Sequence, residues 1–137
     1  FAIMALDCLL IETLSQFYNG VSSNRGCSKS KYKNFLKEYF EGFDDDIAEK
    51  FYDHFRCGIL HQAETKENSK IRINNSLPIV KYTDDKNGLI INRKKFHKEL
   101  LNIIDNYIER LKEPAEEELR KNFKRKMNFI CRVKENK

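Results

Sequence analysis

The sequence contains no tryptophan, so any apolar core must take its bulk from other side chains. Ten phenylalanines and six tyrosines are available for that purpose. Internal repeats and low-complexity tracts are also missing, which argues against a repeat architecture. With 137 residues, the chain is long enough to bury one core but too short for two domains of ordinary size. We therefore expect a single domain over residues 1–137.

The sequence also lacks a long uninterrupted apolar run. Residues 1–12 are the most apolar stretch, but Asp7 and Glu12 interrupt them well short of the length that spans a bilayer, and no basic leader is present. We expect an amphipathic core helix here and no membrane partner. Because the chain opens inside this helix without an initiator methionine, we also expect native sequence before Phe1.

Cysteines in closely spaced pairs are missing as well. Cys8, Cys27, Cys57 and Cys131 show neither the spacing of a zinc ribbon nor the density of a disulfide-stapled secreted domain. Reduced thiols in a cytoplasmic protein fit this pattern best. We therefore predict a cytoplasmic location and no cofactor.

Charge is abundant and unbalanced. Apolar residues make up 40% of the chain and charged residues 34%, a balance that suits a compact soluble fold better than a disordered one. The net charge of +5 favours a polyanionic partner such as RNA. Solvated lysine faces explain the same charge, and the basic run over residues 120–126 can be read in either way.

Apolar residues at helical spacing predict a helix that ends near Asn19-Gly20, and a second helix that starts near Ser28 or Ser30. A third helix follows Asp44-Asp45-Asp46, which provide a cap and complement the helix dipole. The positions expected to be buried in these three helices are Leu6, Leu9, Leu10, Thr13, Leu14 and Phe17, then Tyr32, Phe35, Leu36, Tyr39 and Phe40, then Ile47, Phe51, Phe55 and Ile59.

Two further helices are expected in the C-terminal half. Asn92 can cap a fourth helix that runs to Lys112, and Pro114 suits the first turn of a fifth. Between the third and fourth helices, residues 70–92 contain β-prone segments around Asn87-Gly88, which predict a small hairpin packed on the helices. The expected buried positions are Phe96, Leu100, Ile103, Ile104, Tyr107, Ile108 and Leu111, then Leu119, Phe123, Met127 and Ile130. The fold class is thus mainly α, a four- to five-helix bundle with an inserted β-hairpin.

The third helix carries the residues best suited to chemistry. Arg56 stays charged and can hold a phosphate with two hydrogen bonds, while His61 titrates near neutral pH and can transfer a proton. Together they can cleave RNA through attack of the ribose 2′-hydroxyl, with no metal ion. At about 100° per residue, however, the two side chains lie roughly 140° apart on an ideal helix. Either the helix bends at Gly58, or two copies of the motif share one cleft across a symmetric dimer.

Arginine, four intervening residues and histidine near the end of a long helix resemble the motif of the HEPN superfamily. This resemblance implies a four- or five-helix bundle that forms a homodimer through the motif helix. It also implies a metal-independent endoribonuclease, such as a toxin with an antitoxin partner, a phage-defence effector or an RNA-processing enzyme, or else a relative that only binds nucleotides or partners. Arg56 and His61 match the motif, whereas Cys57 stands where the family often has asparagine or aspartate.

Neighbouring residues provide auxiliary candidates. Tyr52 lies one turn before Arg56 and can orient it or stack on a base, although core packing explains an aromatic residue there equally well. Asp53 and Glu64 are candidate carboxylate partners of His61, and solvated surface carboxylates are the alternative.

A competing interpretation places zinc on the same helix. His54, Cys57 and His61 follow at spacings of three and four, which puts them on one helical face. A fourth ligand would have to come from Cys8, Cys27, Glu64 or His97. We favour no metal site, and we expect His97 to be packed or solvent-facing. Nothing in the sequence around Cys57 supplies the electropositive surroundings that a nucleophilic thiolate needs.

The preferred function is therefore RNA cleavage by Arg56 and His61. The alternatives are a non-catalytic module that binds RNA, a nucleotide or a protein, and a structural adaptor.

Overall fold

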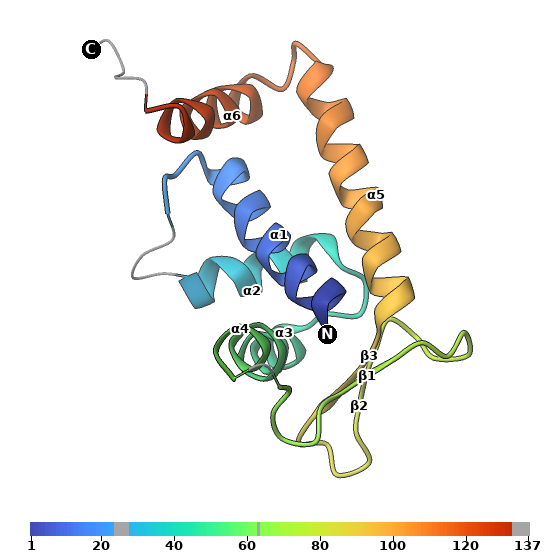
Figure 1. The fold of residues 1–137 in the computed structure, drawn as a ribbon. Coiled ribbons are helices and arrows are strands. Elements are labelled where there is room, and N and C mark those ends of the chain that lie inside the picture. Colours follow the sequence, from blue (N-terminus) through green and yellow to red (C-terminus); the bar gives the residue numbers. More distant parts are fainter. Residues whose placement is uncertain (24–27, 63, 133–137) are drawn as a thin grey trace.

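The computed structural model describes residues 1–23, 28–62 and 64–132 (Figure 1). It is mainly helical with one small sheet, as predicted. Within the described residues, no helix is both long and apolar enough to cross a membrane. Helix α1 (Ala2–Asn19) packs against α2 (Ser28–Tyr39), α5 (Arg93–Lys112) and α6 (Glu117–Ile130). The N-terminal helix is therefore the centre of the bundle.

Helix α1 buries only part of the predicted face, because Leu14 is buried and Phe17 is partly buried, whereas the four other positions are exposed. Leu6, Leu9 and Leu10 are 61%, 46% and 39% exposed, and Thr13 is exposed as well. The helix is apolar on almost every side, so helical spacing alone fits more than one stripe. Its end is as predicted, because Gly20 adopts the left-handed conformation of a helix C-cap. The buried face consists of Met4, Asp7, Cys8, Ile11, Leu14 and Ser15.

The third predicted helix is a continuous helical segment with an irregular middle. It begins as α3 (Asp45–Phe51), continues as a π-helical stretch over Tyr52–Arg56 labelled η1, and ends as α4 (Cys57–Gln62). The side chain of Asp44 caps it by accepting from the backbone N–H of Ile47 at 2.8 Å. The predicted ridge is confirmed, because Ile47, Phe51, Phe55 and Ile59 are all buried.

The sheet contains more than the predicted hairpin. Strands β2 (Val80–Tyr82) and β3 (Leu89–Asn92) pair antiparallel, as expected of a hairpin. Strand β1 (Lys70–Arg72) adds to the other edge of β3 in parallel, so the strand order is β1-β3-β2. The sheet lies at the N-terminal end of α5 in Figure 1. The parallel pairing was not predicted, since short strands carry no local signal for a partner 20 residues away.

Helix α5 follows the prediction closely. The side chain of Asn92 caps it by accepting from the Lys95 N–H at 3.3 Å, and the helix ends at Lys112. Phe96 stacks on Phe51 with ring centroids 5.1 Å apart, which ties α5 to the motif-bearing helix. One expected core position is wrong, because Ile108 is 45% exposed.

Helix α6 differs from its prediction at both ends. It starts only at Glu117, so Pro114 lies in the preceding turn and not in the first helical turn. Ile130 is 55% exposed, whereas Lys126 is buried on the face towards α1. The Lys126 ammonium donates to Gln16 Oε1 at 2.6 Å. A polar partner across the interface thus allows a lysine to occupy a core position that helical spacing assigns to apolar residues.

Candidate functional site

Arg56, the first of the two predicted site residues, is clamped in place. Its Nη2 donates to Glu12 Oε2 of α1 at 2.8 Å, and its guanidinium carbon lies 5.3 Å from the centre of the Tyr52 ring. The side chains of Arg56 and Glu12 are only 16% and 18% exposed. Tyr52 thus contacts Arg56 and is also buried in the core, so its role in orienting the guanidinium stays a prediction.

Two further hydrogen bonds extend this contact to α2. Ser28 Oγ donates to the other carboxylate oxygen of Glu12 at 3.2 Å, and Tyr52 Oη donates to Ser28 Oγ at 3.4 Å. Glu12, Ser28, Tyr52 and Arg56 form a closed set, which we call the Arg56 cluster. It joins α1, α2 and the motif helix at one point.

The cluster keeps Arg56 charged. Burial by itself would lower the pKa of Arg56, but the hydrogen bond and the negative charge of Glu12 outweigh it and raise that pKa. The Nε–H of Arg56 is buried and has no partner among the described residues, while Nη1 meets only the weak acceptor Cys57 Sγ at 3.9 Å. The guanidinium thus retains capacity to donate to a phosphate.

His61, the second predicted site residue, is exposed on the last turn of α4. The helix stays regular from Cys57 to Gln62, so the predicted bend at Gly58 is wrong, and the irregularity is the π segment that ends at Arg56. A π turn inside an α-helix is rare and is found frequently at functional sites. Along one helix, the structure therefore places a clamped guanidinium and an exposed imidazole.

Gly58 has a different role from the one predicted. A Cβ at this position would collide with the backbone carbonyl oxygen of Glu64. The chain after α4 folds back here, and the Lys66 N–H donates to the His54 carbonyl oxygen at 3.2 Å. Glycine is required because backbone passes against backbone.

His54, an auxiliary candidate, is a structural residue. It is 9% exposed, and its Nδ1 lies 2.9 Å from Ser69 Oγ, which also accepts from the Leu89 N–H at 2.9 Å. Burial lowers the pKa of His54, which favours the neutral ring in its hydrogen bond with the serine hydroxyl. This histidine fastens the sheet to the motif helix.

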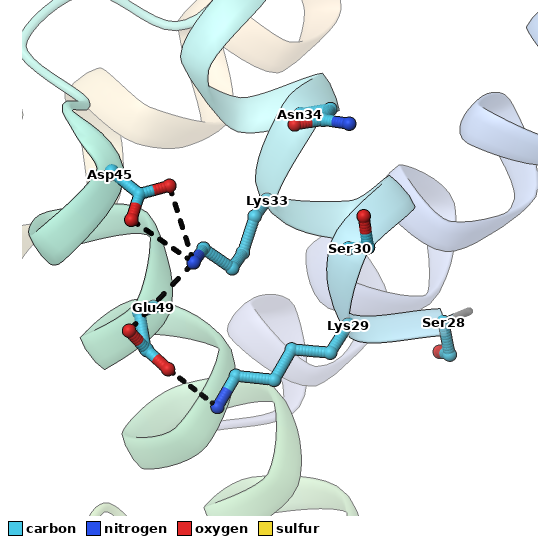
Figure 2. Close-up of a pocket in the computed structure, with 7 residues that line it drawn as sticks. All are labelled: Ser28, Lys29, Ser30, Lys33, Asn34, Asp45 and Glu49. Atoms are coloured by element: carbon cyan, nitrogen blue, oxygen red, sulfur yellow. Dashed lines mark hydrogen bonds and ion pairs between the residues drawn. The ribbon is translucent and has the colours of Figure 1, made fainter. Parts of the chain in front are cut away.

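Of the two carboxylates predicted as partners of His61, one forms an ion pair with another residue and the other is exposed. Asp53 pairs with Lys29 at 3.1 Å, and the Glu64 side chain is exposed. Lys29 also binds Glu49, which lies in a groove of about 610 Å³ between α2 and α3 (Figure 2). In that groove Lys33 faces Asp45 and Glu49, so its lysines are already neutralised by carboxylates.

The residues proposed as zinc ligands are not brought together. His54 is buried against Ser69, whereas His61 is exposed on the last turn of α4. Over residues 1–23, 28–62 and 64–132, no group of three or more metal-ligating side chains is placed to hold an ion. Cys27 lies outside the described residues.

The sequence analysis missed two members of the Arg56 cluster, Glu12 and Ser28. Glu12 was noted only as an interruption of an apolar helix, although a carboxylate beside a buried face signals a need for a cationic partner. Its partner is 44 residues away, which no local pattern can indicate. Comparison with known proteins adds no assignment, because no protein-family model, curated protein or solved structure matches this chain.

Proposed function

We propose that this protein cleaves RNA without a metal ion, with His61 as the proton carrier and Arg56 as the phosphate ligand. The observation that supports this proposal is the contrast along one helix, where the guanidinium is held charged by Glu12 and the imidazole is exposed. These are the two groups that the resemblance to the HEPN superfamily assigns to catalysis.

In the proposed reaction, His61 accepts the proton of a ribose 2′-hydroxyl. The 2′-oxygen then attacks the adjacent phosphorus, the bond from phosphorus to the 5′-oxygen of the next nucleotide breaks, that oxygen takes a proton from water, and a 2′,3′-cyclic phosphate remains. Arg56 binds the phosphate through Nη1 and offsets the negative charge that develops. Glu12 and Tyr52 act as positioning residues that hold the guanidinium plane.

The reaction needs a second copy of the chain. Because residues 57–62 are α-helical, Arg56 and His61 point about 140° apart within one chain. A symmetric homodimer through the motif helix would place His61 of one copy beside Arg56 of the other. The free thiols Cys8, Cys57 and Cys131 suit a reducing cytoplasm, where a toxin controlled by an antitoxin or a phage-defence effector would act.

One observation favours a second candidate, a non-catalytic RNA-binding module. The Arg56 guanidinium is paired with Glu12 at 2.8 Å, so a phosphate at Arg56 has to compete with a carboxylate, which disfavours catalysis there, whereas the net charge of +5 still attracts RNA to the protein. Such a module would bind RNA with a salt-sensitive affinity and leave it intact.

Replacing His61 separates the two functions, because an exposed side chain can be removed without disturbing the fold. We expect H61A to lose cleavage of single-stranded RNA in a chelating buffer while its melting temperature and RNA affinity are kept. The matched control is N102A, which removes an exposed side chain from α5 and should still cleave. Undiminished cleavage by H61A would reject the proposal, and absence of cleavage in the wild type would favour the binding module.

A further inference from the structure

A second constellation of charged residues lies beside α1, at a pocket that the proposed reaction does not use. The pocket is formed by the N-terminal end of α1, strand β1 and the start of α5, and its volume is about 550 Å³. Two arginines line it, Arg72 and Arg93, together with an apolar wall that includes Ile3, Ile71 and Ile73. The pocket therefore combines cationic donors with an apolar surface.

Arg72 and Arg93 differ from the arginines of this molecule that form ion pairs with carboxylates. The side chain of Arg72 donates only to the carbonyl oxygen of Ile71, at 2.9 Å. Within the described part of the chain, no carboxylate forms an ion pair with Arg72 or Arg93. By contrast, Arg56 and Arg110 each bind a glutamate. Two guanidinium groups line one pocket and neither forms an ion pair within the described residues, although Arg93 interacts with the charge of the nearby Asp7, so the pocket favours an anionic ligand.

A histidine stands one helical turn beyond Arg93, on the same face of α5. His97 Nδ1 lies 2.8 Å from Oδ1 of Asp7, whose side chain is only 1% exposed, while the His97 side chain is 41% exposed. Because Nδ1 is turned inwards to the carboxylate, Nε2 on the opposite edge of the ring is turned outwards. Asp7 thus fixes the orientation of the His97 ring, whose other edge is accessible.

Asp7 is an expensive residue to bury. Its second oxygen, Oδ2, has no hydrogen-bond partner among the described residues, and burial raises the pKa of this carboxyl group. The bond to His97 and the charges of His97 and Arg93 act in the opposite direction. A carboxylate held at such cost, with an exposed imidazole as its one hydrogen-bonded partner, is typical of a binding site more than of a core.

We propose that this pocket binds the phosphate group of a phosphate monoester, held by the guanidinium groups of Arg72 and Arg93, with the His97 ring one helical turn from Arg93. The organic part of the ligand would lie on the apolar wall. The charges are complementary, because the two arginines that line the pocket contribute +2 and a phosphate monoester carries about −1.5 to −2 at neutral pH. A phosphodiester, with a single negative charge, matches less well. No bond is made or broken, so the role is binding alone.

The site is independent of the proposed ribonuclease. Asp7 and Glu12 are five residues apart on α1, which places them about 140° apart around the helix. The pocket and the Arg56 cluster therefore lie on different sides of α1. A free small molecule and the terminal phosphate of an RNA present the same chemistry, and the choice of probes separates them.

The test uses the full chain with phenyl phosphate as the probe and calorimetry at low ionic strength. We expect saturable binding of one molecule per chain, and each of R72Q and R93Q should weaken it by about tenfold or more, as expected for a charged hydrogen bond. The matched control is R120Q, which removes one positive charge from the exposed surface of α6 and should change the affinity by less than about twofold. Equal losses in R120Q and R93Q would overturn the proposal, since the attraction would then be diffuse.

Two further measurements use the same variants. On titration with phenyl phosphate, the imidazole resonances of His97 should shift while those of His61 stay in place, and diphenyl phosphate should bind about tenfold more weakly or worse. A shift at His61 alone, equal binding of the diester, or no saturable binding would each overturn the assignment. An RNA with a 5′-phosphate that binds more tightly than phenyl phosphate, and loses this advantage when the phosphate is removed, would support the pocket as a site for RNA ends. The reverse order would support a small-molecule site.

Discussion

Each side of α1 carries an acidic residue paired with a basic one, but the two pairs differ in burial. On one side, Glu12 and Arg56 are both mostly buried, and a tyrosine and a serine complete their contacts. On the other side, Asp7 is fully buried while His97 is exposed, and the neighbouring Arg93 has no ion-pair partner among the described residues. The Glu12–Arg56 pair is therefore a mostly buried structural contact with one accessible edge, whereas the Asp7–His97 pair is accessible to a ligand. Burial, more than residue type, separates the two.

The largest expected effect is a loss of stability when the Glu12–Arg56 ion pair is removed. R56A leaves the Glu12 carboxylate 18% exposed and without its cation, so we expect the free energy of unfolding to fall by about 2–3 kcal/mol. Urea denaturation measures this change. The double variant R56Q with E12Q should recover most of the loss. A loss below about 0.5 kcal/mol in R56A would show that the ion pair does not stabilise the fold.

A smaller effect with a defined pH dependence is expected at His54. Burial lowers the pKa of His54 in the folded chain, so the unfolded chain binds more protons than the folded chain as the pH falls below about 6.5. The stabilising contribution of neutral His54 is thus present above that pH and is lost as the pH falls. H54Q should cost about 1–2 kcal/mol at pH 7.5 and less at pH 5.5. A constant cost across this range would contradict the assignment of a neutral buried ring.

Disrupting the Asp7–His97 pair should lower the free energy of unfolding less than disrupting the Glu12–Arg56 pair. H97A removes the hydrogen-bonded partner of the buried Asp7, but the His97 side chain is 41% exposed, so water can replace the imidazole at the carboxylate and we expect a loss of about 1 kcal/mol in unfolding free energy. The matched change D7N, which keeps the shape and removes the charge, should cost less than H97A. If H97A were as costly as R56A, the two sides of α1 would not differ in the way described.

The smallest effect on stability is expected for His61. Its side chain is exposed, so H61A should change the free energy of unfolding by less than about 0.5 kcal/mol. Thermal melts of wild type and H61A should overlay. A large shift would mean that His61 has a structural partner in an assembly of two chains.

These regions also show what the sequence could predict. The helix boundaries at Gly20, Asp44, Asn92 and Lys112 follow from local rules for caps and spacing, and they are confirmed. The buried face of α1 was predicted only in part, since a helix that is apolar all round gives no preferred side. The late start of α6 was missed as well, because proline is compatible with a turn as well as with a first helical turn.

The candidate site divides in the same way. Arg56 and His61 lie close in sequence, so their spacing alone drew attention to them, and the π segment that ends at Arg56 has no simple sequence signal. Glu12 and Asp7 acquire their roles from partners 44 and 90 residues away, which only the packed fold brings into contact. Sequence spacing alone therefore predicts a packed or solvent-facing His97 and gives no sign of its carboxylate partner.

The most direct test of the central claim, that Arg56 and His61 act on one phosphate from two copies of the chain, is mixing of inactive variants. H61A and the double variant R56Q with E12Q are unfolded together, refolded together and assayed for cleavage of single-stranded RNA in a chelating buffer. Half of the dimers should be mixed, and each mixed dimer should hold one intact site of two, so about a quarter of the wild-type rate should return. No recovery from two folded, dimerising and individually inactive variants would contradict the shared site.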